Sequence, residues 1–320
     1  MEFFQRTPNA CRGRRSSLFP IQLLALLLAV AGYGINVRAQ GHTVLVEGNC
    51  DSPVPGTTLV APGTCGDFDG DGRIGTAEDT DGADRIFGTI NAALGSGAGA
   101  AAGTGINFNG TVNIVTSGRF SEAIGIQIPN IAMPPTPGNV TLQAAPGVEA
   151  QINAVFQGDP SGGNGTRLQS SGIFINMPAV NRIVLRNLTV KNFAVGIQAA
   201  GSTQLTIDNC RLENNVFHGI LALDSSNLFI TNSSVTATGY RTAGGLTCPG
   251  ASCNPAPGNG ISFGNSSSGS VFQTKLSGNF GAGLANGSTL GATAVRYYEI
   301  FAGQNNNGNI IGPATRVDTP

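Results

Sequence analysis

The chain has 320 residues, of which 47 are Gly and 17 are Pro, and it contains no Trp. Only 11% of the residues are charged, and the formal net charge is −1. This balance is typical of a turn-rich, all-β protein, and it argues against nucleic acid as a partner because nucleic-acid-binding proteins present strongly basic surfaces.

The first 39 residues have the three parts of an export signal. A basic start is followed by the apolar segment Leu18–Ile35, and Val37-Arg38-Ala39 places small side chains before a cleavage point. Pro20 and two glycines interrupt the apolar segment, which favours a cleaved signal over a membrane anchor. We therefore predict a secreted, periplasmic or cell-surface protein with no membrane span after cleavage, exported by either the Sec or the Tat route. The basic residues are Arg12, Arg14 and Arg15.

Loss of the signal removes Cys11 and leaves five cysteines. Two pairs lie close in sequence: Cys50 with Cys65, in the lead segment 40–66, and Cys248 with Cys253. In an exported protein each pair is a plausible disulfide. Cys210 falls among inward-facing positions of a repeat described below, so we expect it to be a buried, inert thiol.

Residues 67–78, DFDGDGRIGTAE, have the spacing of a calcium-binding loop. Carboxylates stand at loop positions 1, 3, 5 and 12, a glycine at position 6 allows the sharp turn, and position 7 offers its backbone carbonyl. The loop resembles those of EF-hand and dockerin proteins, which implies a bound Ca²⁺ ion. A dockerin needs two such loops to present its cohesin-binding face, and only one is found here. The predicted ligands are Asp67, Asp69, Asp71, Arg73 and Glu78.

A short amphipathic segment, Asp84–Leu94, follows the loop. Ile86, Phe87, Ile90 and Leu94 fall with Ala93 on one helical stripe, which predicts a helix. We group residues 67–95 as the calcium loop and this helix. The glycine-rich run Gly95–Gly105 is predicted to be a flexible linker.

A repeat with a period in the low twenties occupies the second half of the chain. Gly196-Ile197 and Gly219-Ile220 are 23 residues apart, and Gly172-Ile173 precedes the first of them by 24. The series continues at Gly260-Ile261 and Gly283-Leu284 after one step of 41 residues, which indicates an insertion. Such a period, built of short strand-like runs, predicts a solenoid.

Each repeat holds three short runs with alternating apolar residues, which predicts three strands per coil and three parallel sheets. Apolar side chains should then stack in inward rows, and asparagines should stack at two bends. The inward rows are Ile183, Leu205, Leu228, Val271; Leu185, Ile207, Ile230, Gln273; Leu188, Cys210, Ser233, Leu276; and Val190, Leu212, Val235. The asparagine rows are Asn187, Asn209, Asn232, and Asn192, Asn214 or Asn215, Asn279.

Over residues 111–290 this pattern resembles the right-handed parallel β-helix of the pectin-lyase-like superfamily. The resemblance implies an all-β, three-sheet solenoid over residues 106–290, and it implies that the helix of Asp84–Leu94 caps the first coil. Residues 291–320 are predicted to be a closing segment and tail. The resemblance is not specific for activity, because this architecture hosts lyases, hydrolases, epimerases and proteins without catalysis.

The strand that begins with Gly-Ile carries the catalytic groups in β-helical polysaccharide enzymes, and here it is poor in them. The residues that should point outward after each isoleucine are uncharged: Phe174, Gln198, Leu221, Ser262 and Ala285. The row before each glycine is Val195, His218, Asn259 and Ala282. His218-Gly219-Ile220 resembles the His-Gly-Ile element of polygalacturonases, but the aspartates that accompany it there are missing.

Two functions remain open on these residues. One is a non-catalytic, monomeric surface or extracellular module that binds an extracellular polysaccharide or another cell-surface component, including proteins. The other is a carbohydrate-active enzyme, a lyase, hydrolase or epimerase. Its candidate catalytic residues are His218, Asp224 and Glu213, assisted by the insertion between Thr236 and Gly258. The first is favoured because acid–base chemistry needs paired titratable groups on one face.

Overall fold

The computed structural model describes residues 42–47, 86–95, 105–106, 109–127, 138–154, 171–177, 182–201, 203–224, 226–239 and 258–317. The chain divides into two units, Met1–Gln40 and Gly41–Pro320, and all described residues belong to the second. The predicted export signal, the calcium loop and both cysteine pairs lie outside the described residues.

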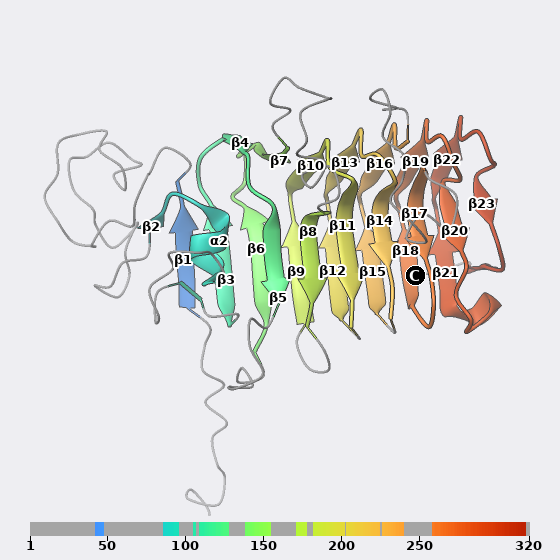
Figure 1. Ribbon diagram of the computed structural model, residues 1–320, viewed down its shortest axis with the longest axis horizontal. Helices are drawn as coiled ribbons and strands as arrows, with labels where there is room; N and C mark the ends of the chain where they lie inside the picture. The colour runs from blue at the N-terminus through green and yellow to red at the C-terminus, as the bar shows by residue number, and fades with distance from the viewer. Residues whose placement is uncertain are drawn as a thin grey trace, which may run out of the picture. The chain divides into compact units, whose positions relative to one another are not determined.

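Three parallel sheets wind around one apolar core, with one strand of each sheet in every complete coil (Figure 1). Sheet 1 has ten strands in the order β2-β1-β3-β6-β9-β12-β15-β18-β21-β24. Sheet 2 has the order β22-β19-β16-β13-β10-β7-β4, and sheet 3 has the order β23-β20-β17-β14-β11-β8-β5. This is the three-sheet parallel β-helix that the repeat predicts.

The strand bounds follow the three runs of each repeat. Sheet 1 comprises β1 (His42–Val46), β2 (Ile86–Phe87), β3 (Gly110–Ile114), β6 (Val140–Ala144), β9 (Arg182–Arg186), β12 (Gln204–Asp208), β15 (Asn227–Thr231), β18 (Ser268–Phe272), β21 (Val295–Tyr298) and β24 (Thr315–Arg316). Sheet 2 comprises β4 (Gly118–Phe120), β7 (Ala150–Asn153), β10 (Leu188–Lys191), β13 (Arg211–Glu213), β16 (Ser234–Thr236), β19 (Lys275–Ser277) and β22 (Phe301–Gly303). Sheet 3 comprises β5 (Ile124–Gln127), β8 (Ser171–Asn176), β11 (Val195–Ala200), β14 (His218–Ala222), β17 (Asn259–Phe263), β20 (Leu284–Asn286) and β23 (Ile310–Ile311).

The inward rows are confirmed from β9 to β15. Leu205 pairs with both Ile183 and Leu228, and Ile207 pairs with both Leu185 and Ile230. All of these side chains are buried. Residues about two dozen apart in sequence are therefore vertical neighbours, and each coil buries the apolar face of the next.

The predicted rows are wrong by two residues in the coil that begins at β18. Leu228 pairs with Gly269, and Val271 lies beside Ile230. Because glycine has no apolar side chain, Gly269 is not recognised as an inward position from the sequence. The ring of Phe263 fills the space instead, and a Cβ on Gly269 would lie 2.8 Å from its Cε1 atom. The same shift places Thr274 beside Ser233, Leu276 beside Val235 and Gln273 beside Asn232.

The glycines of the Gly-Ile pairs stack as predicted. The 41-residue step between Gly219 and Gly260 is an insertion, also as predicted. Strand β14 pairs directly with β17, which brings His218 beside Asn259 and Ile220 beside Ile261. The extra residues therefore fall between β16 and β17 in sequence, and the register of the coils on either side is unaffected. Close stacking explains the glycines: a Cβ on Gly260 would lie 2.7 Å from the carbonyl oxygen of Gly283.

The predicted capping helix is shorter than expected. Helix α2 spans only Ile90–Leu94, with Thr89 as its N-cap and Gly95 in a left-handed conformation as its C-cap. Residues Ile86–Phe87 form strand β2 instead, because they pair with the edge of β1. The predicted role is kept, since α2 packs against β1, β3 and β5.

Contacts with the first complete coil hold α2 in place. The Glu122 carboxylate accepts hydrogen bonds from the backbone N–H groups of Ile90 (2.7 Å) and Asn91 (3.0 Å). The Asn91 side chain donates to the carbonyl of Ala123 and accepts from Gly125 N. Burial raises the pKa of Glu122, although the backbone N–H donors and Asn91 oppose this shift.

The coils continue past residue 290, where the sequence predicts that they end. Strands β21, β22, β23 and β24 pair in register with β18, β19, β20 and β21. The predicted closing segment is therefore a further coil. The repeat is hard to recognise there because partly buried side chains such as Tyr297 and Ala302 replace the aliphatic residues of the inward rows.

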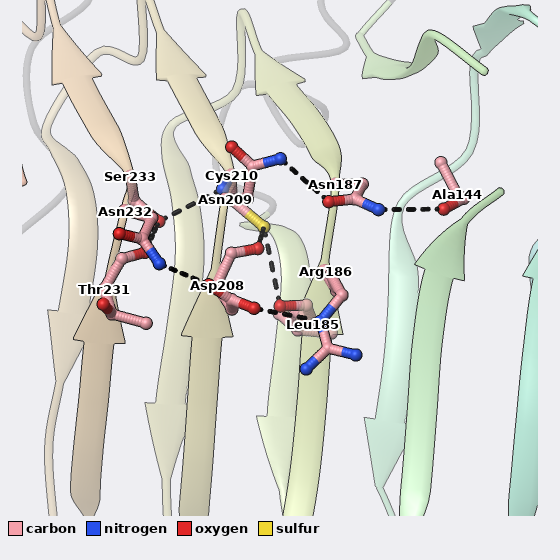
Figure 2. A network of polar contacts seen from close by, with 10 residues as sticks. All are labelled: Ala144, Leu185, Arg186, Asn187, Asp208, Asn209, Cys210, Thr231, Asn232 and Ser233. Carbon is pink, nitrogen blue, oxygen red and sulfur yellow. Dashed lines mark hydrogen bonds and ion pairs between the residues drawn. The ribbon is translucent and has the colours of Figure 1, made fainter. Parts of the chain in front are cut away.

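Asparagines make the tight bends between sheets 1 and 2. Asn187, Asn209 and Asn232 have left-handed φ values of 58°, 51° and 50°, as a one- or two-residue corner requires. The Asn209 side chain donates to Asn187 Oδ1 (2.9 Å), and Asn187 donates to the Ala144 carbonyl (3.2 Å). Figure 2 shows these bonds passing from coil to coil. Asn232 does not continue this series of amide hydrogen bonds, because its side chain donates to Asp208 Oδ1 and not to Asn209.

A second, buried amide ladder lies at the bend between sheets 2 and 3. Asn215 Oδ1 accepts from Phe193 N (3.1 Å), and its Nδ2 donates to the Val190 carbonyl (3.3 Å). Asn279 repeats both bonds to Thr238 N and the Val235 carbonyl. Asn215 and Asn279 are thus equivalent, whereas Asn192 and Asn214 form the neighbouring left-handed row.

Candidate functional site

The three residues predicted to form a catalytic cluster make their hydrogen bonds to other partners. His218 begins β14 in sheet 3, Glu213 ends β13 in sheet 2, and Asp224 lies in the bend after β14. Glu213 accepts from Arg211, and Asp224 accepts from the Asn265 side chain (2.8 Å). Most of the insertion between Thr236 and Gly258, which is predicted to assist them, lies outside the described residues.

His218 belongs to a small buried polar cluster on the outward face of sheet 3. Its Nδ1 lies 3.1 Å from Ser262 Oγ, and the Asn259 side chain donates to the same oxygen (3.1 Å). Asn259 Oδ1 in turn accepts from Ala282 N (2.7 Å). Since Ser262 Oγ already accepts from Asn259, its proton is free to be donated to His218 Nδ1.

This environment leaves His218 poorly suited to proton transfer with a substrate. The side chain is 2% exposed, and burial lowers its pKa to about 4, so the ring is neutral near pH 7. Asn259 bonds to the serine and not to the imidazole, so it does not orient the ring as the third member of a catalytic triad does. The cluster therefore serves to satisfy polar groups that are buried together.

An open polar groove crosses the outward face of sheet 2. It has a volume of about 400 Å³ and lies over β7, β10 and β13. Glu213 is one of its lining residues, so one predicted site residue does border a concave surface. The lining residues are Ala145, Pro146, Gly147, Val148, Glu149, Gln151, Asn187, Leu188, Thr189, Lys191, Asn209, Arg211 and Glu213.

A change in bend length produces the groove. Five residues, 145–149, connect β6 to β7, and they include a turn in which Val148 N donates to the Ala145 carbonyl (3.0 Å). In the next coil Asn187 alone connects β9 to β10. The broad bend therefore forms one wall of the groove, and the bends of Asn187 and Asn209 lie in the recess beside it.

Charged and hydroxyl side chains form the floor in two rows. Gln151, Thr189 and Arg211 are paired across three strands, and Lys191 and Glu213 are paired in the adjacent row. Arg211 Nη2 lies 2.7 Å from Glu213 Oε1, so these two charges neutralise each other. Within the part of the chain that the structure describes, the Lys191 ammonium and the exposed Glu149 carboxylate have no such partner.

The sequence pattern identifies Glu213 but not the rest of the groove. Outward residues are most easily recognised on the Gly-Ile strand, where the structure confirms the register of Gln198, Leu221 and Ser262 but buries Leu221 and Ser262. The sequence signal for the groove is the alternation of polar residues at the outward positions of the sheet 2 strands, such as Thr189 and Lys191 in β10. The length of the 145–149 bend is the second signal.

The described ranges contain neither a metal-binding cluster nor a membrane-spanning helix. No group of three or more His, Cys, Asp and Glu side chains there could hold a metal ion. No helix there is long and apolar enough to cross a membrane. Cys210 is a free thiol buried in the core, and burial raises its pKa to about 12, so it is inert as predicted.

Comparison with known families agrees with the fold. Residues 153–308 match the family model described as a right-handed beta helix region. The solenoid is therefore a right-handed, three-sheet parallel β-helix. Comparisons with curated proteins and with solved structures found no match.

The depressed pKa of His218 predicts an acid-sensitive contribution to stability. The unfolded chain binds a proton near pH 6.5 and the folded chain only near pH 4, so this contribution is present above pH 6.5 and is lost as the pH falls through 4. We expect His218 to account for a loss of about 3 kcal/mol in unfolding free energy between pH 7 and pH 4. Denaturant titrations of the parent and of His218→Gln at several pH values measure it. Equal pH dependence in both proteins would contradict the buried, neutral imidazole.

Proposed function

We propose that this right-handed parallel β-helix is a non-catalytic extracellular module that binds a polysaccharide or another cell-surface component as a monomer. The groove on sheet 2 is the observation that carries the proposal. It is open to solvent, runs across three strands, and combines amides, a hydroxyl and charged side chains along its floor.

The chemistry of the groove suits a hydroxyl-rich ligand. Gln151 and Thr189 offer hydrogen-bond donors and acceptors, and Asn187 and Asn209 add amides in the recess beside the wall. Lys191 and Glu149 supply a cation and an anion that have no ion-pair partner among the described residues. Because the strands fix the backbone from which these side chains project, the entropy lost when a ligand binds is confined to the side chains.

A hydrolase, lyase or epimerase is the alternative, and one observation favours it. Glu149 and Glu213 both border the groove, and glycoside hydrolysis commonly uses two carboxylates. Against it, Glu213 is held in an ion pair with Arg211, and His218 is buried away from the groove lining. Binding without turnover therefore fits the geometry better.

Lys191 and Gln151 provide the test of the groove. We expect Lys191→Ala combined with Gln151→Ala to weaken binding of a glycan selected on an array by about tenfold or more, because a charge and an amide contact are both lost. Isothermal titration calorimetry measures the affinity. Lys275→Ala is the matched control, since Lys275 is an exposed cation of sheet 2 that does not line the groove.

Two outcomes would count against this function. A parent protein that binds no glycan, or a double variant that binds like Lys275→Ala, would remove the groove as a binding site. Release of reducing ends or unsaturated products by the parent, abolished in Glu213→Gln, would establish the enzyme instead.

Export and calcium binding belong to the same proposal and rest on the sequence. The signal-like residues 1–39 and the acidic loop 67–78 suit a protein that works outside the cytoplasm, where calcium is abundant. Asp67, Asp69, Asp71 and Glu78 would contribute carboxylate oxygens, and Arg73 its carbonyl. The loop precedes β2 and α2 in sequence, so the ion would stabilise the start of the solenoid.

Calcium should raise the thermal stability of the parent and not that of a loop variant. In Asp67→Ala combined with Glu78→Ala, the first and last carboxylates of the loop are removed, so we expect calcium to leave the melting temperature unchanged. Differential scanning calorimetry with calcium and with a chelator measures the effect. A parent that melts at the same temperature in both conditions would exclude a stabilising ion.

A further inference from the structure

An aromatic cluster lies on the outward face of sheet 1, which is a different face from the groove. Phe229 of β15, Phe272 of β18 and Tyr298 of β21 come from three successive strands. The ring centroids of Phe229 and Phe272 are 5.3 Å apart at an interplanar angle of 64°, and those of Phe272 and Tyr298 are 6.5 Å apart at 68°. We call these three residues the aromatic platform.

Phe229 is exposed within the platform and contacts the ring of Phe272. It is 42% exposed, whereas Phe272 is 8% exposed and packs edge-on against it. An exposed phenyl ring is unfavourable in water, and the edge-on contact with Phe272 restricts its rotamers before any ligand binds. An aromatic ring that is already packed on one side and faces solvent on the other loses less conformational entropy on binding.

The two strands that carry Phe229 and Phe272 present no charged side chain on the outward face. The remaining outward side chains of β15 and β18 are amides and hydroxyls, and Ser268 Oγ donates to Asn227 Oδ1 (3.4 Å). The nearest charges lie on the flanking strands: Asp208 of β12, diagonal to Phe229, is paired with Arg186 at 3.0 Å, and Arg296 of β21 lies beside Ser270. The uncharged outward residues are Asn227, Thr231, Ser268 and Ser270.

The size of the exposed ring distinguishes between two kinds of partner. A stable protein interface needs about 800 Å² from each partner, with several apolar anchors, whereas Phe229 is the one exposed ring of the platform, Tyr298 is half-buried and Phe272 is buried. One phenyl face matches the apolar C–H face of one sugar ring, and the neighbouring hydroxyls and amides match sugar hydroxyls. From β12 to β21 the sheet extends about 14 Å, which accommodates a short oligosaccharide.

We propose that the aromatic platform is a second saccharide-binding site, which takes an uncharged polysaccharide with one sugar ring stacked on Phe229. It goes beyond the groove on sheet 2, because it lies on another sheet and uses stacking in place of charge. A protein that engages polysaccharide through both faces would be held by two independent contacts.

Substitution of Phe229 tests the platform directly. The probes are soluble neutral polysaccharides, namely hydroxyethylcellulose, glucomannan and galactomannan, and the readout is affinity electrophoresis confirmed by calorimetry. We expect Phe229→Ala in the full chain to weaken binding to at least one of them by about tenfold or more, while Phe229→Tyr keeps it within about threefold. Unchanged thermal midpoints show that both variants are folded.

Two control variants show whether the loss of binding is specific to the platform. Phe301→Ala removes a phenyl ring that is 68% exposed on sheet 2, so it controls for the general loss of exposed aromatic surface and should leave binding unchanged. Lys275→Ala removes an exposed cation that lines neither the groove nor the platform, so it should also leave binding unchanged. Loss of binding in Lys191→Ala combined with Gln151→Ala, with Phe229→Ala binding as the parent does, would assign the binding to the groove and not to the platform. The inference is overturned if the parent binds none of the three polysaccharides, or if Phe229→Ala binds as the parent does.

Discussion

The stacking of apolar side chains between successive coils is the constraint on which the rest of the molecule depends. A coil of three short strands has an inner face, but it cannot bury that face alone. Ile207 is buried because Leu185 lies on one side of it and Ile230 on the other in the same row. Each such side chain contributes about 1.5–3 kcal/mol, and the contribution requires neighbouring coils to keep one register.

Register in turn determines how the chain can turn. Corners of one or two residues keep the strands aligned, and asparagine accepts the left-handed backbone that such corners need. Where a corner is buried, as at Asn215, the side-chain amide also satisfies a backbone donor and a backbone acceptor of the preceding coil. A coil is then free to differ from its neighbours mainly in the length of its bends. The groove arises in this way, since a five-residue bend stands next to the single-residue bend at Asn187.

The two candidate binding surfaces follow from the same geometry. Outward positions alternate with inward ones, so every strand presents side chains whose vertical spacing is set by the sheet at about 4.8 Å. On sheet 2 these positions hold Thr189, Lys191 and Arg211, and on sheet 1 they hold Phe229. The fold thus provides rigid rows, and the identity of the outward residues determines which ligand chemistry each face accepts.

The sequence predicts the solenoid, its three sheets and most inward rows, because alternation and a regular period report directly on burial. The prediction of inward positions fails where the inward residue is not a large apolar one. Gly269 occupies an inward position that Phe263 fills from another strand, and the coil after Leu290 uses partly buried residues. Helix α2 is predicted too long because pairing with β1 overrides the helical pattern at Ile86–Phe87. The groove depends on the difference between two adjacent bends, and neither it nor the burial of His218 follows from a strand pattern.

Removal of one coil measures the central claim most directly. Residues 187–208 form one repeat, and their deletion joins Arg186 to Asn209, which occupies the same bend position as Asn187. The account predicts that this shortened chain retains its β-sheet circular dichroism and a cooperative thermal transition, because every inward row regains its register. Deletion of residues 187–197 removes half a coil and should abolish folding. If the full-coil deletion unfolds the protein, or if the half-coil deletion is tolerated equally well, then stacking of equivalent residues does not hold the structure together.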